Sequence, residues 1–127
     1  MINIQMKNKK YELMKLKGTS VESAMWHVGF IYEIEQAEIE SQLGLPHVIE
    51  SDSSRTFGGE ELWWGYEIDK AIVLLRFCVS YKEIHIHSNI RNKKILFEIV
   101  SSFNISNNIE IFDVYYPTNQ KARDTKC

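Results

Sequence analysis

Three consecutive antiparallel strands are predicted by residues 61–87, ELWWGYEIDKAIVLLRFCVSYKEIHIH. Residues 61–68 are rich in aromatic side chains, residues 71–79 are apolar on both faces, and residues 83–87 alternate strictly between polar and apolar. Connections of two and three residues separate the three segments, and such short connections join antiparallel neighbours. The middle segment is therefore expected to be the central strand of its sheet.

The segment before this block predicts a helix over residues 20–43. Thr19-Ser20-Val21-Glu22 forms a capping box, apolar residues then recur at spacings of three and four, and Gly44-Leu45-Pro46 supplies a stop. The first half of this helix is apolar all round, because Trp26 and Phe30 add a second apolar stripe. We therefore expect a second layer or a partner to cover that half.

The remaining elements complete an α+β order. Residues 11–17 predict a weak strand, residues 91–103 a second helix capped by Ser88 or Asn89, and residues 109–116 a last strand. The order is (β)-α-β-β-β-α-β, which predicts two helices packed on a mostly antiparallel sheet.

The length of 127 residues is enough for one core, so we expect a single α+β domain over residues 1–117 and a polar C-terminal tail over 118–127. No apolar run approaches the roughly 20 residues that a membrane span needs, and no secretory signal is visible. Two cysteines make no disulfide framework, so Cys78 is expected to be a buried thiol and Cys127 a thiol in the tail. These features favour a cytoplasmic protein with no membrane contact.

The charge is distributed unevenly along the chain. Residues 1–17 carry a net charge of +4, residues 18–69 of −10 and residues 70–127 of +4, which together give the net charge of −2. Within the acidic stretch, residues 50–56 have loop composition and residues 57–59 predict a turn, so the connection from Pro46 to the strand that begins at residue 61 is long for a compact domain. The acidic stretch either attracts a basic partner or forms a solvated face that the basic ends neutralise.

Aromatic residues gather inside the acidic stretch. Trp63 and Trp64 must point to opposite sides of their strand, so one indole is expected to face another layer or a partner unless the helices pack both. Tryptophan and tyrosine concentrate at the centres of protein interfaces, and carboxylates at the rim attract basic partners. Four glutamates, Glu33, Glu35, Glu38 and Glu40, also crowd the second half of the predicted first helix, where the helix dipole disfavours anions. Both features favour a surface made for a partner.

Glu83, His85 and His87 point to one side of their strand. Two histidines in this pattern can hold a metal ion, but a site needs a third ligand, and the spacing shows none. A half-exposed polar strand face explains the same residues, so we assign no metal, cofactor or catalytic residue and leave metal binding by these three open.

The element order over residues 19–116 resembles the core of the PD-(D/E)xK nucleases, in which a hairpin Asp and a following Glu-x-Lys hold a divalent ion. Asp69 can stand for the hairpin acid and Glu83 for the glutamate, but His85 occupies the lysine position. An acidic flank also suits nucleic-acid phosphates poorly. A degenerate metal-dependent nuclease is therefore the alternative interpretation.

The acidic helix that begins at Thr19 and the segment GGEELWWGYEID at residues 58–69 resemble, in general character, bacterial immunity proteins of contact-dependent growth inhibition and related polymorphic toxin systems. The resemblance implies a stoichiometric inhibitor, not an enzyme, that covers the cationic site of a cognate toxin domain such as a nuclease and does not itself contact nucleic acid. A domain that forms a homodimer through Trp26 and Phe30 is a third class left open. The residues expected to bind the toxin are Glu33, Glu35, Glu38, Asp52, Glu60, Glu61, Trp63, Trp64, Tyr66 and Glu67.

Overall fold

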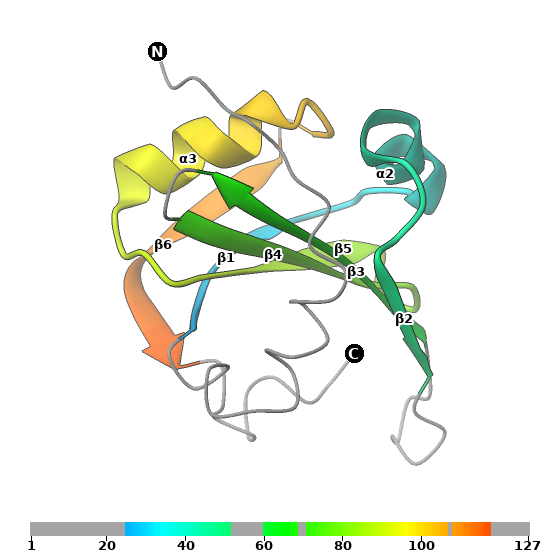
Figure 1. The fold of residues 1–127 in the computed structure, drawn as a ribbon, viewed down its shortest axis with the longest axis horizontal. Coiled ribbons are helices and arrows are strands. Elements are labelled where there is room, and N and C mark those ends of the chain that lie inside the picture. Colours follow the sequence, from blue (N-terminus) through cyan, green and yellow to red (C-terminus); the bar gives the residue numbers. More distant parts are fainter. Residues whose placement is uncertain (1–24, 52–59, 69–70, 107, 118–127) are drawn as a thin grey trace.

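The computed structural model describes residues 25–51, 60–68, 71–106 and 108–117 (Figure 1). These residues form two helices and one six-stranded antiparallel sheet, so the α+β class and the order of elements are as predicted, with one short strand added. The elements are β1 (Trp26–Ile31), α2 (Gln36–Leu43), β2 (Val48–Ser51), β3 (Glu60–Ile68), β4 (Ala71–Cys78), β5 (Glu83–Ser88), α3 (Lys93–Ser102) and β6 (Ile109–Pro117).

The strands lie in the order β2-β3-β4-β5-β1-β6, and every neighbouring pair is antiparallel. The predicted central position of β4 is confirmed, because β3 and β5 flank it. Strand β1 inserts between β5 and β6, which makes β2 and β6 the two edges of the described sheet.

The prediction of one helix over residues 20–43 is wrong for much of its length. Residues 26–31 form β1, and the helix covers only residues 36–43. An interior strand is apolar on both faces, and this explains the all-round apolar character of the segment that contains Trp26 and Phe30. Residues 20–24 and the weak strand predicted over 11–17 lie outside the described residues.

Two further details differ from the sequence-based expectation. Residues 50 and 51 belong to β2, whereas a loop was expected over 50–56; the rest of that stretch lies outside the described residues. Helix α3 is capped by Asn92, whose side-chain oxygen accepts a hydrogen bond from the Ile95 amide at 3.0 Å. Asn89 instead accepts a hydrogen bond from the Ile72 amide at 2.8 Å and so ties the start of β4 to the end of β5.

Both helices lie on the same side of the sheet in Figure 1 and pack against one hydrophobic core. Ile39 from α2 and Leu96 from α3 meet alternate side chains of the central strands there, including Trp64 and Leu75. A smaller cluster contains Trp63 of β3, Leu74 of β4 and Met25, which precedes β1. The sheet therefore buries apolar side chains on both of its faces.

Gly29 marks the closest approach of β1 to β6. The register of β1 shifts between His27 and Gly29 against both neighbouring strands. A Cβ atom on Gly29 would lie 2.2 Å from the carbonyl oxygen of Glu110. A larger residue at this position must therefore push the β6 backbone away.

We predict that Gly29→Ala separates β1 from β6 and lowers the free energy of unfolding by about 1–3 kcal/mol, the usual cost of overpacking. Amide hydrogen exchange should accelerate in β6 more than in β3 or β4. Gly44→Ala is the control, because a Cβ at Gly44 meets nothing within 4 Å and the cost there arises from its positive φ of 79°. Unchanged protection of β6 in the Gly29 variant would contradict the prediction.

Candidate functional site

The predicted partner-binding acids that the structure describes lie just before and within α2 and at the two ends of β3. Glu33, Glu35, Glu38 and Glu60 are exposed, whereas Glu61 is buried and Glu67 is half-buried. Asp52 lies outside the described residues. The segment from Glu33 to Glu40 contains four glutamates and no lysine or arginine, so it presents concentrated negative charge.

Two of these acids, Glu35 and Glu38, stabilise the start of α2. Glu35 is the N-cap of α2, and its backbone amide donates a hydrogen bond to Glu38 Oε1 at 3.1 Å in a capping box. The helix dipole favours carboxylates at an N-terminus, so Glu35 and Glu38 stabilise α2, and the expectation that the dipole opposes them is wrong. Lys82, in the turn after β4, pairs with Glu35 at 3.0 Å, but both side chains remain more than half exposed.

The two adjacent indoles point to opposite faces of β3, as expected, but neither reaches the surface. Trp64 is 0% exposed in the main core and Trp63 is 3% exposed in the smaller cluster. Tyr66 is also buried, where desolvation raises the pKa of its hydroxyl to about 12. The hairpin aromatics are therefore packed within the fold, and the indole on the second face, Trp63, lies in the smaller cluster and is not exposed.

The connection from α2 to β2 is held by β3 at two points. The Trp64 indole nitrogen donates a hydrogen bond to the Gly44 carbonyl at 3.1 Å. The His47 amide donates to the Trp63 carbonyl at 2.8 Å, and His47 Nδ1 accepts from the Gly65 amide at 2.9 Å. Between these anchors, Leu45 is 77% exposed.

Ile49, two residues beyond His47 in β2, is 60% exposed. Leu45 and Ile49 were not predicted as binding residues, because Gly44-Leu45-Pro46 was interpreted only as the end of a helix. An apolar residue between a helix stop and a strand is the one signal in the sequence that pointed to Leu45.

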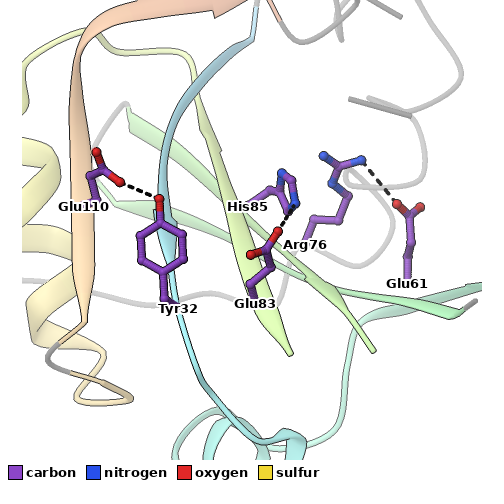
Figure 2. Close-up of polar contacts among 6 residues, drawn as sticks. All are labelled: Tyr32, Glu61, Arg76, Glu83, His85 and Glu110. Atoms are coloured by element: carbon purple, nitrogen blue, oxygen red, sulfur yellow. Dashed lines mark hydrogen bonds and ion pairs between the residues drawn. The ribbon is translucent and has the colours of Figure 1, made fainter. Parts of the chain in front are cut away.

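A buried polar cluster occupies the sheet face on which Trp63 lies. Arg76 on β4 and Glu61 on β3 form an ion pair at 3.2 Å, and their side chains are only 5% and 4% exposed (Figure 2). Arg76 also lies over the Trp63 ring, with 5.8 Å between the guanidinium carbon and the ring centroid. Sequence reasoning assigned Glu61 to the partner surface because the position of Arg76 across the hairpin depends on strand register.

Three imidazoles lie beside this ion pair. The His27 ring is stacked on His85 and on His87, with centroid separations of 5.1 and 5.0 Å and interplanar angles of 24° and 29°. Imidazole lone pairs lie in the ring plane, so stacked rings do not direct their nitrogens to one ion. Within residues 25–51, 60–68, 71–106 and 108–117, no group of three His, Cys, Asp or Glu side chains could hold a metal ion.

Glu83 and His85 share one face of β5, as the alternation predicts, and Glu83 Oε1 lies 3.3 Å from His85 Nε2 (Figure 2). Burial, with a further contribution from the nearby Arg76 and His27, lowers the pKa of His85 to about 2. Burial also raises the pKa of Glu83, against the opposing effects of Arg76 and His27. His85 is therefore a neutral imidazole at physiological pH, unlike the lysine whose position it takes in the nuclease comparison; Asp69 lies outside the described residues.

The residues considered for a homodimer engage their own chain. The Arg91 guanidinium lies 4.5 Å from the centroid of the half-buried Trp26 ring, and Phe30 makes edge contacts with His27 and His85. Tyr32, which follows β1, donates a hydrogen bond of 2.5 Å to Glu110 (Figure 2). Desolvation, reinforced by this carboxylate, raises the pKa of Tyr32 to about 12.

Cys78 is fully buried in β4 and is disulfide-bonded, so the expectation of a free thiol there is wrong. None of the helices in the described part of the chain has the length and apolar character needed to cross a membrane. Comparisons with protein-family models, with curated proteins and with solved structures found no match to this chain.

The buried neutral imidazole of His85 predicts loss of stability in acid. Its pKa is near 6.5 in the unfolded chain and about 2 in the folded protein, so its contribution is complete above pH 6.5 and falls as the pH drops from 6.5 toward 2. This single group should add up to about 1.4 kcal/mol per pH unit to the acid slope of the free energy of unfolding. Urea unfolding at a series of pH values measures that slope.

His85→Phe provides the comparison, because it keeps a planar ring in contact with Phe30 and removes the titrating group. The slope of the unfolding free energy against pH gives the number of protons taken up on unfolding. Between pH 6.5 and 4, we expect this number to be smaller by about one in the variant than in the wild type. Equal slopes in the two proteins would show that His85 is protonated in the folded state or is reached by solvent.

Proposed function

We propose that this protein is an immunity protein of a bacterial polymorphic toxin system, which binds a cognate toxin domain with nuclease activity and blocks its site. The observation that carries the proposal is the acidic segment Glu33–Glu40, which has four glutamates, three of them exposed, and no basic residue. A stoichiometric inhibitor needs an anionic surface and no catalytic group of its own.

Electrostatics connects this segment to a nuclease. A nuclease must bind phosphates with cationic side chains, and a complementary acidic surface accelerates encounter with such a site and excludes nucleic acid from it. Glu35 and Glu38 also cap α2, so the helix start holds two of the charges in fixed positions. We propose a cytoplasmic location because the nucleic-acid substrates of a toxin of this kind lie there; the disulfide at Cys78 is the one feature that is more common in oxidising compartments.

Among the ten residues expected to bind the toxin, the proposal relies on the exposed acids Glu33, Glu35, Glu38 and Glu60. The buried residues Glu61, Trp63, Trp64 and Tyr66 support the sheet on which these acids are displayed. That Glu67 and Asp52 contact the toxin domain stays a prediction.

The alternative is a degenerate PD-(D/E)xK nuclease that uses Glu83 and His85. One observation favours it: these two side chains lie together beside Arg76, and burial raises the pKa of Glu83. Such an enzyme would cleave nucleic acid by itself with Mg²⁺ or Mn²⁺.

Co-expression with the product of the adjacent gene, which the proposal expects to be a toxin domain, tests the two functions. We expect cells that express this toxin domain to survive only when the protein is present, and the purified proteins to form a 1:1 complex that lacks nuclease activity. The protein alone should leave DNA and RNA intact with Mg²⁺ or Mn²⁺. Metal-dependent cleavage that Glu83→Ala abolishes would establish the alternative, and a toxin that kills despite the protein would refute immunity.

Neutralising the acidic segment should slow association. In the triple variant Glu33→Gln, Glu35→Gln and Glu38→Gln, each glutamine retains an oxygen that can accept the capping hydrogen bonds while three charges disappear. We expect the association rate at low salt to fall on the order of tenfold, with a smaller change in dissociation rate.

Stopped-flow measurements at increasing salt test the cause of this effect, because screening acts on steering between separated charges. The difference between wild type and variant should shrink as salt rises. Glu98→Gln on α3 is the control for position, since it removes one half-buried carboxylate from another element, and we expect it to leave the association rate nearly unchanged. An association rate that is independent of salt in the wild type would contradict electrostatic steering.

A further inference from the structure

We propose that the partner docks on the sheet edge formed by Leu45 and Ile49 beside α2, and that it offers an apolar socket bordered by basic side chains. The inference rests on the proposed function and names the contact surface and the chemistry of the partner. Its central residues are apolar and lie in the α2–β2 segment, whereas the buried tryptophans of the hairpin take no part.

Exposure is the first observation. Leu45 is 77% exposed and Ile49 60% exposed, although the same chain buries a large apolar core. Single exposed apolar residues are common, but two within five residues at a sheet edge form an apolar centre that is typical of interfaces. Glu33 and Glu38 are also exposed and lie before and at the start of α2, the helix that leads to Leu45, so the segment that precedes the apolar pair carries negative charge.

The second observation is that hydrogen bonds hold the backbone on both sides of Leu45 in place. The Gly44 carbonyl is held by the Trp64 indole at 3.1 Å, and His47 is held by backbone groups of Trp63 and Gly65 at 2.8 and 2.9 Å. These contacts come from a strand buried in the core, so Leu45 is displayed on a backbone fixed at both ends. Binding through a preorganised side chain loses little conformational entropy.

The third observation is the position of Ile49. It lies opposite Leu62 across β2 and β3, so it points to the helix-covered side of the sheet, where Leu62 belongs to the core. Within the described sheet, β2 has one neighbour, β3. Exposed apolar side chains on an edge strand favour contact with another chain.

The negative charge of segment Glu33–Glu40 indicates which kind of partner fits this surface. A symmetric dimer through this edge would bring two copies of the acidic segment Glu33–Glu40 to one interface. Like charges brought together at an interface oppose association. A partner with basic residues around its apolar socket meets the same surface with complementary charge, so a different, basic protein fits better than a second copy.

The test measures binding of the toxin domain encoded by the neighbouring gene to the full-length protein. The double variant Leu45→Ala with Ile49→Thr should weaken binding about tenfold or more, mainly through faster dissociation, because central apolar anchors dominate binding energy. Val114→Thr is the matched control: Val114 is 65% exposed on β6, at the opposite edge of the sheet, and its replacement should leave binding unchanged. Thermal unfolding of each variant excludes loss of fold as the cause.

Two single variants test the chemistry of the partner. Leu45→Lys and Leu45→Glu both remove the apolar contact, and only the lysine adds a charge that a basic border repels. We expect Leu45→Lys to bind more weakly than Leu45→Glu, with a gap that narrows as salt rises. Weaker binding of Leu45→Glu than of Leu45→Lys would contradict the proposal that basic side chains border the partner's socket.

The remaining outcomes separate this inference from the proposed function. Wild-type binding that the double variant retains would overturn the Leu45–Ile49 surface and leave immunity intact. Absence of wild-type binding and of protection in cells would refute both. Sedimentation of the protein alone that shows a dimer disrupted by the double variant would assign this edge to a second copy instead.

Discussion

The buried ion pair between Arg76 and Glu61 ties the hairpin β3–β4 to one register. Trp63 lies directly opposite Arg76 in this register, and Glu61 is the next residue along β3 on the same face. A slip of one residue would turn these charges toward the helix-covered core, where desolvation without partners is very costly. The same register places Trp64 in that core, and the Trp64 indole then holds Gly44 and the start of the α2–β2 connection.

Much of the fold follows from local patterns, and the exceptions have a physical origin. β3, β4 and β5 and helix α3 were predictable because their alternation or their three-and-four spacing is complete within each segment. β1 was not, because an interior strand is apolar on both faces and Met25, Val28 and Ile31 also fit a helical spacing. Local spacing cannot distinguish these two structures; the neighbours β5 and β6 decide between them.

The candidate site was predictable only where exposure depends on local chemistry. The exposure of Glu33, Glu35 and Glu38 follows from their charge. Because α2 starts at residue 36, Glu35 and Glu38 lie at a helix N-terminus, where the dipole favours them, and not in the second half of a longer helix. The buried state of Trp63 and Glu61 depends on a second covered face, and the pairing with Arg76 depends on register across strands. Neither can be derived from a run of adjacent residues, and the same is true of the stack of His27, His85 and His87.

The fixed α2–β2 connection also bears on how such a protein can diverge. Its shape is set by Gly44, His47 and the indole of Trp64, whereas the Leu45 side chain between them contributes little to the core. In the proposed complex, substitutions at Leu45, Ile49 or Glu33 would alter which surface is recognised while the sheet stays the same. Under that proposal, selection for new specificity and selection for a stable fold would act on different residues, so a change of partner would not first require a loss of stability.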